Sequence, residues 1–166
     1  MFRFTGLTAA IVAFGVIISA PVAHAGTWED GLKAFARKEY AAAAKLFRPL
    51  AEKGNAVAQY RISLMHNMGL GVSKDRKQAQ KWSRLAAKQG NPEAQVLLGS
   101  LYYTGEGKES EDIEKAYMWY DVAAMQGNDE AKKELAAVSS QLTSQQIAEA
   151  RAKAQKCASS GYQQCD

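Results

Sequence analysis

The chain has few of the residues from which most metal and catalytic sites are built. It contains two histidines and two cysteines among 166 residues, and His24 lies in an N-terminal segment that we expect to be removed. A zinc site needs three or four ligands, which one remaining histidine cannot supply if the two cysteines pair with each other. No serine lies in a recognisable triad motif with that histidine. The sequence therefore predicts no catalytic residues, no metal and no cofactor.

The formal net charge of the chain is also low. The formal net charge is +4, which is too small to indicate nucleic-acid binding, because that function depends on many Lys and Arg contacts to phosphates. We therefore expect no nucleic-acid partner.

The first 25 residues have the pattern of a secretory signal peptide. Arg3 supplies positive charge, residues 7–19 are almost continuously apolar or small, and Ala23-His24-Ala25 is an A-x-A cleavage signature. The apolar run is short for a bilayer span, so an uncleaved anchor is the less favoured alternative. No cysteine follows the run, so a lipid anchor is not indicated. We expect cleavage after Ala25, a periplasmic or secreted protein, and no later membrane insertion.

Residues 56–128 consist of two copies of one sequence repeat, 56–91 and 92–128. Gly-Asn pairs that begin at Gly54, Gly90 and Gly127 punctuate the copies, so the unit recurs after 36 and then 37 residues. A period of this length is typical of a helical solenoid. One pair of helices cannot bury its apolar face alone, so we expect neighbouring units to stack.

Each copy predicts two helices. In the first copy, Ala58, Ile62 and Met65 share one helical face, and Gly69 ends that helix because glycine readily adopts the left-handed conformation. The second helix of each copy carries one tryptophan, Trp82 or Trp119, which we expect to fill the space between the helices.

The second copy carries a spaced pattern of mainly small, aromatic and glycine residues, namely Leu98, Gly99, Tyr102, Gly105, Gly107, Lys115, Ala116, Trp119, Ala123, Ala124 and Gly127. With this pattern the copy resembles the Sel-1-like repeat (SLR), a relative of the tetratricopeptide repeat. The first copy departs from the pattern, with Ser63 for the usual glycine and His66 for the usual tyrosine. We expect these two changes to loosen the packing locally while the register is kept. The resemblance implies an all-α fold, a right-handed α-solenoid of stacked helix-turn-helix repeats, and a protein-binding function.

Residues 26–166 read as one domain of about eight helices. A degenerate N-terminal unit, 28–55, precedes the two repeats, and capping helices at 129–160 and a tail at 157–166 follow them. Proline inside a helix removes a hydrogen bond and clashes with the preceding turn, so Pro49 predicts a bend or break near Phe47. Thr143 followed by Gln146 is a capping box that starts the last helix.

Both cysteines, Cys157 and Cys165, lie near the C-terminus. In an oxidising compartment an even number of cysteines this close in sequence predicts one disulfide, here a staple for the end of the chain. A redox-active pair is the less favoured alternative, because there is no C-x-x-C motif. The resemblance supports the staple, since some cysteine-rich SLR proteins use the same spacing to tie helices together.

The histidine and the two loops admit more than one interpretation. We expect His66 to be a structural residue rather than a metal ligand. The acidic run in the second copy lacks the pattern of a calcium loop, and the corresponding loop of the first copy is basic. We read both as solvated loops, and the alternative is that they form the specificity edge of a binding surface. Their charged residues are Glu106, Glu109, Glu111, Asp112 and Glu114, and Lys74, Arg76, Lys77 and Lys81.

The first helices leave one further face, which a solenoid turns toward its concave side. That face contains apolar and aromatic residues where water would favour polar ones, so it predicts a binding groove. The alternatives are that a terminal helix covers the face or that the helices are buried on more sides. The candidate binding residues are Tyr60, Arg61, Leu64, Asn67, Val96, Leu97 and Tyr103, with Ser100, Lys133, Glu134 and Ala137 beside them.

Together these patterns predict a non-enzymatic module that binds a partner protein or peptide, as an adaptor, assembly factor or regulator. One alternative is an enzyme that acts on the cell wall or on β-lactams, an activity to which some cysteine-rich SLR proteins have been linked. The other is a structural protein that self-associates through its apolar face.

Overall fold

The computed structural model describes residues 27–105 and 110–165, so the predicted signal peptide and Glu106 and Glu109 of the acidic run lie outside the described residues. The described part contains eight α-helices and no strand. None of these helices is long and apolar enough to cross a bilayer. The helices are α1 (Trp28–Ala36), α2 (Tyr40–Glu52), α3 (Ala56–Met68), α4 (Arg76–Ala87), α5 (Pro92–Tyr103), α6 (Ser110–Met125), α7 (Asp129–Ser139) and α8 (Ser144–Ser159).

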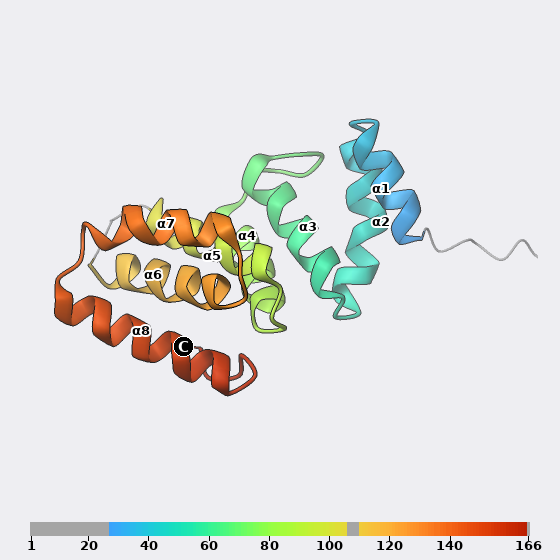
Figure 1. Ribbon diagram of the computed structural model, residues 1–166. Coiled ribbons are helices and arrows are strands. Elements are labelled where there is room, and N and C mark those ends of the chain that lie inside the picture. Colours follow the sequence, from blue (N-terminus) through green and yellow to red (C-terminus); the bar gives the residue numbers. More distant parts are fainter. Residues whose placement is uncertain (1–26, 106–109, 166) are drawn as a thin grey trace, which may run out of the picture.

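The helices stack in chain order from α1 to α7. Each packs against the next one along the chain, and in addition α3 contacts α5 and α5 contacts α7. Figure 1 shows the resulting row, which begins with α1 and α2 and ends with α7 and α8. This arrangement is an all-α solenoid, as the repeat period predicted, and it places the first helices of successive units side by side.

The Gly-Asn pairs are the joints between units. Each glycine has a positive φ, between 81° and 93°, which glycine adopts without strain. The asparagine that follows is the N-cap of the next helix. Asn55, Asn91 and Asn128 each accept a hydrogen bond, of 2.7–2.9 Å, from the backbone N–H three residues later. One dipeptide therefore ends one unit and starts the next.

Buried glutamines connect the units in the same way at two successive joints. Gln59 Nε2 donates to the Ala51 carbonyl at 3.0 Å, and its Oε1 accepts from Gln89 Nε2 at 2.7 Å. One repeat later, Gln95 donates to the Ala87 carbonyl at 3.1 Å and accepts from Gln126 at 2.6 Å. Each of these two glutamines thus bonds both to a backbone carbonyl of the preceding unit and to a glutamine near the end of its own unit.

The first repeat does not pack loosely at Ser63, contrary to the expectation from its sequence. Ser63 is fully buried, and its hydroxyl donates to the Ala79 carbonyl of α4 at 2.7 Å. His66 is 8% exposed, and its Nδ1 lies 3.2 Å from the Ser73 carbonyl, so it holds the loop between α3 and α4. Each of these two side chains therefore joins α3 to a later segment of its repeat by a polar contact.

The expected break near Phe47 is also absent, because α2 continues through Pro49 to Glu52. Proline removes one helical donor, whose acceptor would be the carbonyl four residues earlier, at Lys45. Lys45 lies on the exposed side of α2, while Phe47 is fully buried and anchors the helix. Burial of the apolar face therefore outweighs the loss of one hydrogen bond near the end of the helix.

The last helix lies against α6. Figure 1 shows α6 between α7 and α8. Gln146 Nε2 donates to Glu114 Oε1 at 2.9 Å, and Arg151 donates to the Tyr117 hydroxyl at 2.9 Å. The predicted capping box is confirmed at Thr143.

The predicted disulfide between Cys157 and Cys165 is present. Both cysteines are buried, and both belong to the apolar core around α6. Between them, the ring of Tyr162 lies so close to Gly90 that a Cβ on that glycine would be 2.6 Å from the ring. The tail therefore reaches back to the joint between α4 and α5, besides stapling the end of α8.

Candidate functional site

The predicted binding residues lie on two helices that contact each other, α3 and α5. Together with their neighbours on α7 they form a surface that we call the α3–α5–α7 face. Val96 is only 7% exposed and belongs to the core, so it offers little surface. The other predicted residues are partly exposed, and they are Tyr60, Arg61, Leu64, Asn67, Leu97 and Tyr103.

Tyr60 of α3 is influenced by carboxylates of the two following first helices, α5 and α7. Burial raises the pKa of its hydroxyl above the ordinary value, Arg61 lowers it, and the carboxylates of Glu93 on α5 and Glu130 on α7 raise it. Its ring also packs against the core around α6. Tyr60 therefore has one buried side and one side on the surface, as an anchor for a ligand would.

Arg61 lies at the end of this face nearest α1. Its guanidinium carbon is 5.7 Å from the centre of the Phe35 ring and 5.9 Å from that of Tyr60. A cation over two aromatic rings is held in place without a carboxylate partner. The Arg61 Nε is buried and has no hydrogen-bond partner within the described part of the chain.

Tyr103 lies at the opposite end of the face. Its hydroxyl accepts a hydrogen bond from Gln141 Nε2 at 2.6 Å, which ties α5 to the turn between α7 and α8. Because α8 packs on α6, the C-terminal helix does not cover this face. The N-terminal helix α1 packs on α2 and meets this face at its end, where Phe35 lies near Arg61.

The most exposed large apolar side chains are not the ones that the sequence singled out. They are Val57, Met68, Leu85 and Met125, each between 42% and 59% exposed. Scattered exposed apolar residues are ordinary in soluble proteins. They do provide matched positions for control substitutions.

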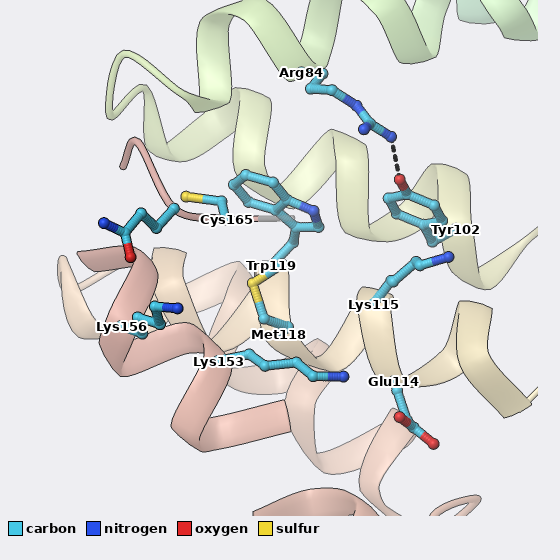
Figure 2. A pocket seen from close by; sticks show the side chains of 10 residues that line it. Arg84, Tyr102, Glu114, Lys115, Met118, Trp119, Lys153, Lys156 and Cys165 are labelled. Atoms are coloured by element: carbon cyan, nitrogen blue, oxygen red, sulfur yellow. Dashed lines mark hydrogen bonds between the residues drawn. The ribbon is translucent and has the colours of Figure 1, made fainter. Parts of the chain in front are cut away.

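The structure also has a pocket of about 570 Å³ that the sequence did not predict. It lies among α4, α5, α6, α8 and the C-terminal tail, as Figure 2 shows. Its cations are far apart in the sequence, so only the packing of α6 and α8 brings them together. The single signal in the sequence is the i, i+3 spacing of Lys153 and Lys156 on α8. The lining residues are Arg84, Tyr102, Glu114, Lys115, Met118, Trp119, Lys153, Lys156, Gln164 and Cys165.

The structure brings part of the two charged loops together. Arg76, at the start of α4, donates to the Thr104 hydroxyl at 3.4 Å and lies near Gly105 at the start of the acidic loop. Within the described residues, no three His, Cys, Asp or Glu side chains lie close enough together to hold a metal ion.

A row of stacked helix pairs with an accessible face of first helices defines a helical repeat protein. The Sel1 repeat family model matches residues 56–91 and 92–128, the same bounds that the sequence period indicated. Residues 56–128 therefore carry two Sel1 repeats. Proteins of this class are in general protein-interaction modules, and their repeats are generally non-catalytic.

Known proteins that are similar to this chain include a plant protein and an antigen from Escherichia coli. The ERAD-associated E3 ubiquitin-protein ligase component HRD3A of Arabidopsis thaliana is 36% identical over 86 residues, which are 51% of this chain and 13% of that protein. A protective antigen of uropathogenic Escherichia coli strains, solved as an SLR fold, is 32% identical with a TM-score of 0.73. That match covers 81% of this chain and 30% of the antigen's chain. The chain thus spans less than a third of either relative.

Proposed function

We propose that this protein is a non-enzymatic adaptor, assembly factor or regulator that works in the periplasm or outside the cell. It binds a segment of a partner protein on the α3–α5–α7 face. The observation that carries the proposal is the pair of tyrosines at the two ends of this face, Tyr60 and Tyr103, each anchored on its inner side and partly exposed.

The energetics of interfaces favour this assignment. Binding energy concentrates in a few aromatic and arginine side chains that are surrounded by weaker contacts. Tyr60 and Arg61 lie together at one end, Leu64 and Leu97 add partly exposed apolar area, and Tyr103 marks the other end. The face is preformed by helix packing, so an extended or helical peptide would bind with little reordering of the protein.

The partner would be identified by affinity capture from the native cell envelope followed by mass spectrometry. We expect Tyr60→Ala with Tyr103→Ala to lose the specific partner, while the circular dichroism spectrum remains that of a folded helical protein. The matched control is Leu85→Ala with Met125→Ala, which removes exposed apolar area elsewhere and should keep the partner. Leu64→Lys with Leu97→Lys tests the same face without removing a ring that packs on the core.

Capture of the same partner by both variants of the α3–α5–α7 face would contradict the proposal and direct attention to the charged loops. A concentration-dependent molar mass in light scattering, abolished by the same variants, would instead identify a second copy of the chain as the occupant. Hydrolysis of nitrocefin would favour a β-lactam-acting enzyme.

Export is tested separately. Mass spectrometry of the protein from its native host should find a mature N-terminus at Gly26. Intact Met1 in a soluble fraction would contradict the proposed location without bearing on the binding face.

A further inference from the structure

The pocket is lined by positively charged side chains from three helices. Arg84 comes from α4, Lys115 from α6, and Lys153 and Lys156 from α8. Among the described residues that line the pocket, Glu114 is the one carboxylate, and it accepts a hydrogen bond from Gln146 Nε2 at 2.9 Å. Figure 2 shows these side chains around one opening. Cations that outnumber the acids in a concave site attract anionic ligands.

Two of the cations are held in place by Tyr102. Arg84 donates a hydrogen bond to the Tyr102 hydroxyl, which Figure 2 marks with a dashed line. The guanidinium carbon of Arg84 lies 5.9 Å from the centre of the Tyr102 ring, and the Lys115 ammonium lies 5.7 Å from it. Tyr102 therefore fixes one cationic side of the pocket and adds an aromatic surface to it.

The other cationic side is less constrained. Lys153 and Lys156 are exposed, and neither forms an ion pair with any described residue. They project from one side of α8, three residues apart. Met118 and Trp119 of α6 line the space between the two cationic sides, but they are only 4% and 2% exposed. The partly exposed ring of Tyr102 therefore supplies aromatic surface to the pocket, and Gln164 and Cys165 of the tail also line it.

We propose that this pocket binds an acidic peptide segment of a partner protein, with one bulky apolar side chain packed against the Tyr102 ring. A volume of about 570 Å³ lies within the range of ligand pockets and is larger than a lone inorganic anion needs. A bare anion would make no use of that aromatic surface. Nucleic acid binds through an extended row of cations, whereas here the cations surround one concave site. The pocket shares no residue with the α3–α5–α7 face, so the two proposals can be tested independently.

The test uses fluorescence anisotropy with the full mature chain and three labelled peptides. The first has three acidic residues on each side of one phenylalanine, the second has serine in place of that phenylalanine, and the third has lysines in place of the acids. We expect the first peptide to bind, the second to bind at least about fivefold more weakly, and the third not to bind. Raising the salt from 0.05 to 0.5 M should weaken binding, because exposed charges are screened.

Lys153→Glu with Lys156→Glu reverses one cationic side of the pocket, and both side chains are exposed, so the fold should be kept. We expect at least about a tenfold loss of affinity for the first peptide, since the change replaces attraction by repulsion. Lys45→Glu with Lys53→Glu makes the same change in net charge on exposed positions at α2, and it should alter the affinity by less than about twofold.

Three outcomes would overturn the proposal. One is equal loss of affinity in the α2 control, which would show attraction by net charge alone. Another is equal binding of the phenylalanine and serine peptides, which would leave the Tyr102 ring without a role. The third is displacement of the bound peptide by inorganic phosphate at matched ionic strength and comparable concentration, which would indicate a simple anion site.

Discussion

The ring of Tyr120 lies directly against Gly99. A Cβ on Gly99 would be 2.8 Å from the ring and 3.2 Å from the Ala116 carbonyl, so no larger residue fits without movement. In the first repeat, Ser63 takes the place of Gly99 and Ser83 takes that of Tyr120. Both serine hydroxyls donate to the Ala79 carbonyl, at 2.7 and 2.9 Å. The two helices of each repeat thus pack closely at this point in two different ways. In the second repeat a large side chain lies over a glycine, and in the first repeat two serines bond to the same carbonyl.

This relationship predicts a coupling between the two positions. Gly99→Ala should destabilise the fold by about 1–3 kcal/mol, because a buried methyl group would be forced against the ring. In the Tyr120→Ser background the same change should cost much less, since the ring is gone. Chemical denaturation of the four proteins of this double-mutant cycle measures the coupling. Equal costs in the two backgrounds would contradict the proposed contact.

The buried glutamines should contribute to the free energy of unfolding through their hydrogen bonds. Gln95→Leu removes the partner of the Ala87 carbonyl and of Gln126, so we expect a loss of about 1–3 kcal/mol in the free energy of unfolding. Lys132 occupies the corresponding place on α7 and is exposed. Lys132→Leu is therefore the control and should change stability by less than about 1 kcal/mol. A neutral Gln95→Leu would show that the glutamine bonds add no net stability.

Removal of the disulfide should loosen the tail but keep the repeats. Replacement of both cysteines by serine should lower the melting temperature modestly, since closure of such a short loop contributes roughly 2–3 kcal/mol in the chain-entropy account. The stack is nearly one-dimensional, so α1 to α4 should keep their protection in hydrogen exchange, while the region around Tyr162 and Gly90 loses it. Thiol labelling of the denatured, unreduced protein should find no free cysteine.

Uniform loss of exchange protection from α1 to α8 in that variant would contradict this local role of the disulfide. A melting curve identical to that of the wild type would show that the tail is held by its other contacts.

Asp121 should make stability depend on pH in an uncommon direction for a carboxylate. Burial raises its pKa above the ordinary value of 3.8, and this effect exceeds the opposing influence of Arg151, whose Nε lies 3.7 Å away. The folded state therefore binds the proton more tightly than the unfolded state does. The contribution of this group to stability is fully present below the unfolded pKa and is lost as the pH rises through the folded pKa.

Asp121→Asn removes this titration and leaves Arg151 with its bond to Tyr117. We expect the variant to gain stability relative to wild type at pH 7, and the gain to shrink as the pH falls toward 4. Urea denaturation at a series of pH values measures the difference. A gain that grows on acidification would show that the ion pair with Arg151 dominates instead.

Much of the fold could be predicted because it is local. Asn55, Asn91 and Asn128 cap helices through bonds to residues three positions ahead, and the glycines before them need only their own backbone freedom. Such signals repeat with the unit, so the period alone located both repeats. Pro49 shows the limit of local rules, because the burial of Phe47 keeps α2 intact.

The candidate site was predicted only in part. The repeat period was enough to find the face of α3 and α5, because one helix displays its own pattern. The repeat period could not predict that Val96 lies in the core, since its burial depends on contacts with neighbouring helices. The glutamine bonds were missed for the same reason, because each joins two side chains about thirty residues apart within one unit.

By itself, the sequence determined the unit, its helices and its joints, and it indicated the disulfide through the spacing of its two cysteines. The tertiary structure alone decided where α8 and the tail lie, and with them the cationic pocket. Arg84, Lys115 and Lys153 are separated by some thirty residues or more, and no local pattern relates them. They meet because α8 buries its apolar side on α6. Burial of apolar area is not directional, so the sequence of α8 could predict that it packs but not where.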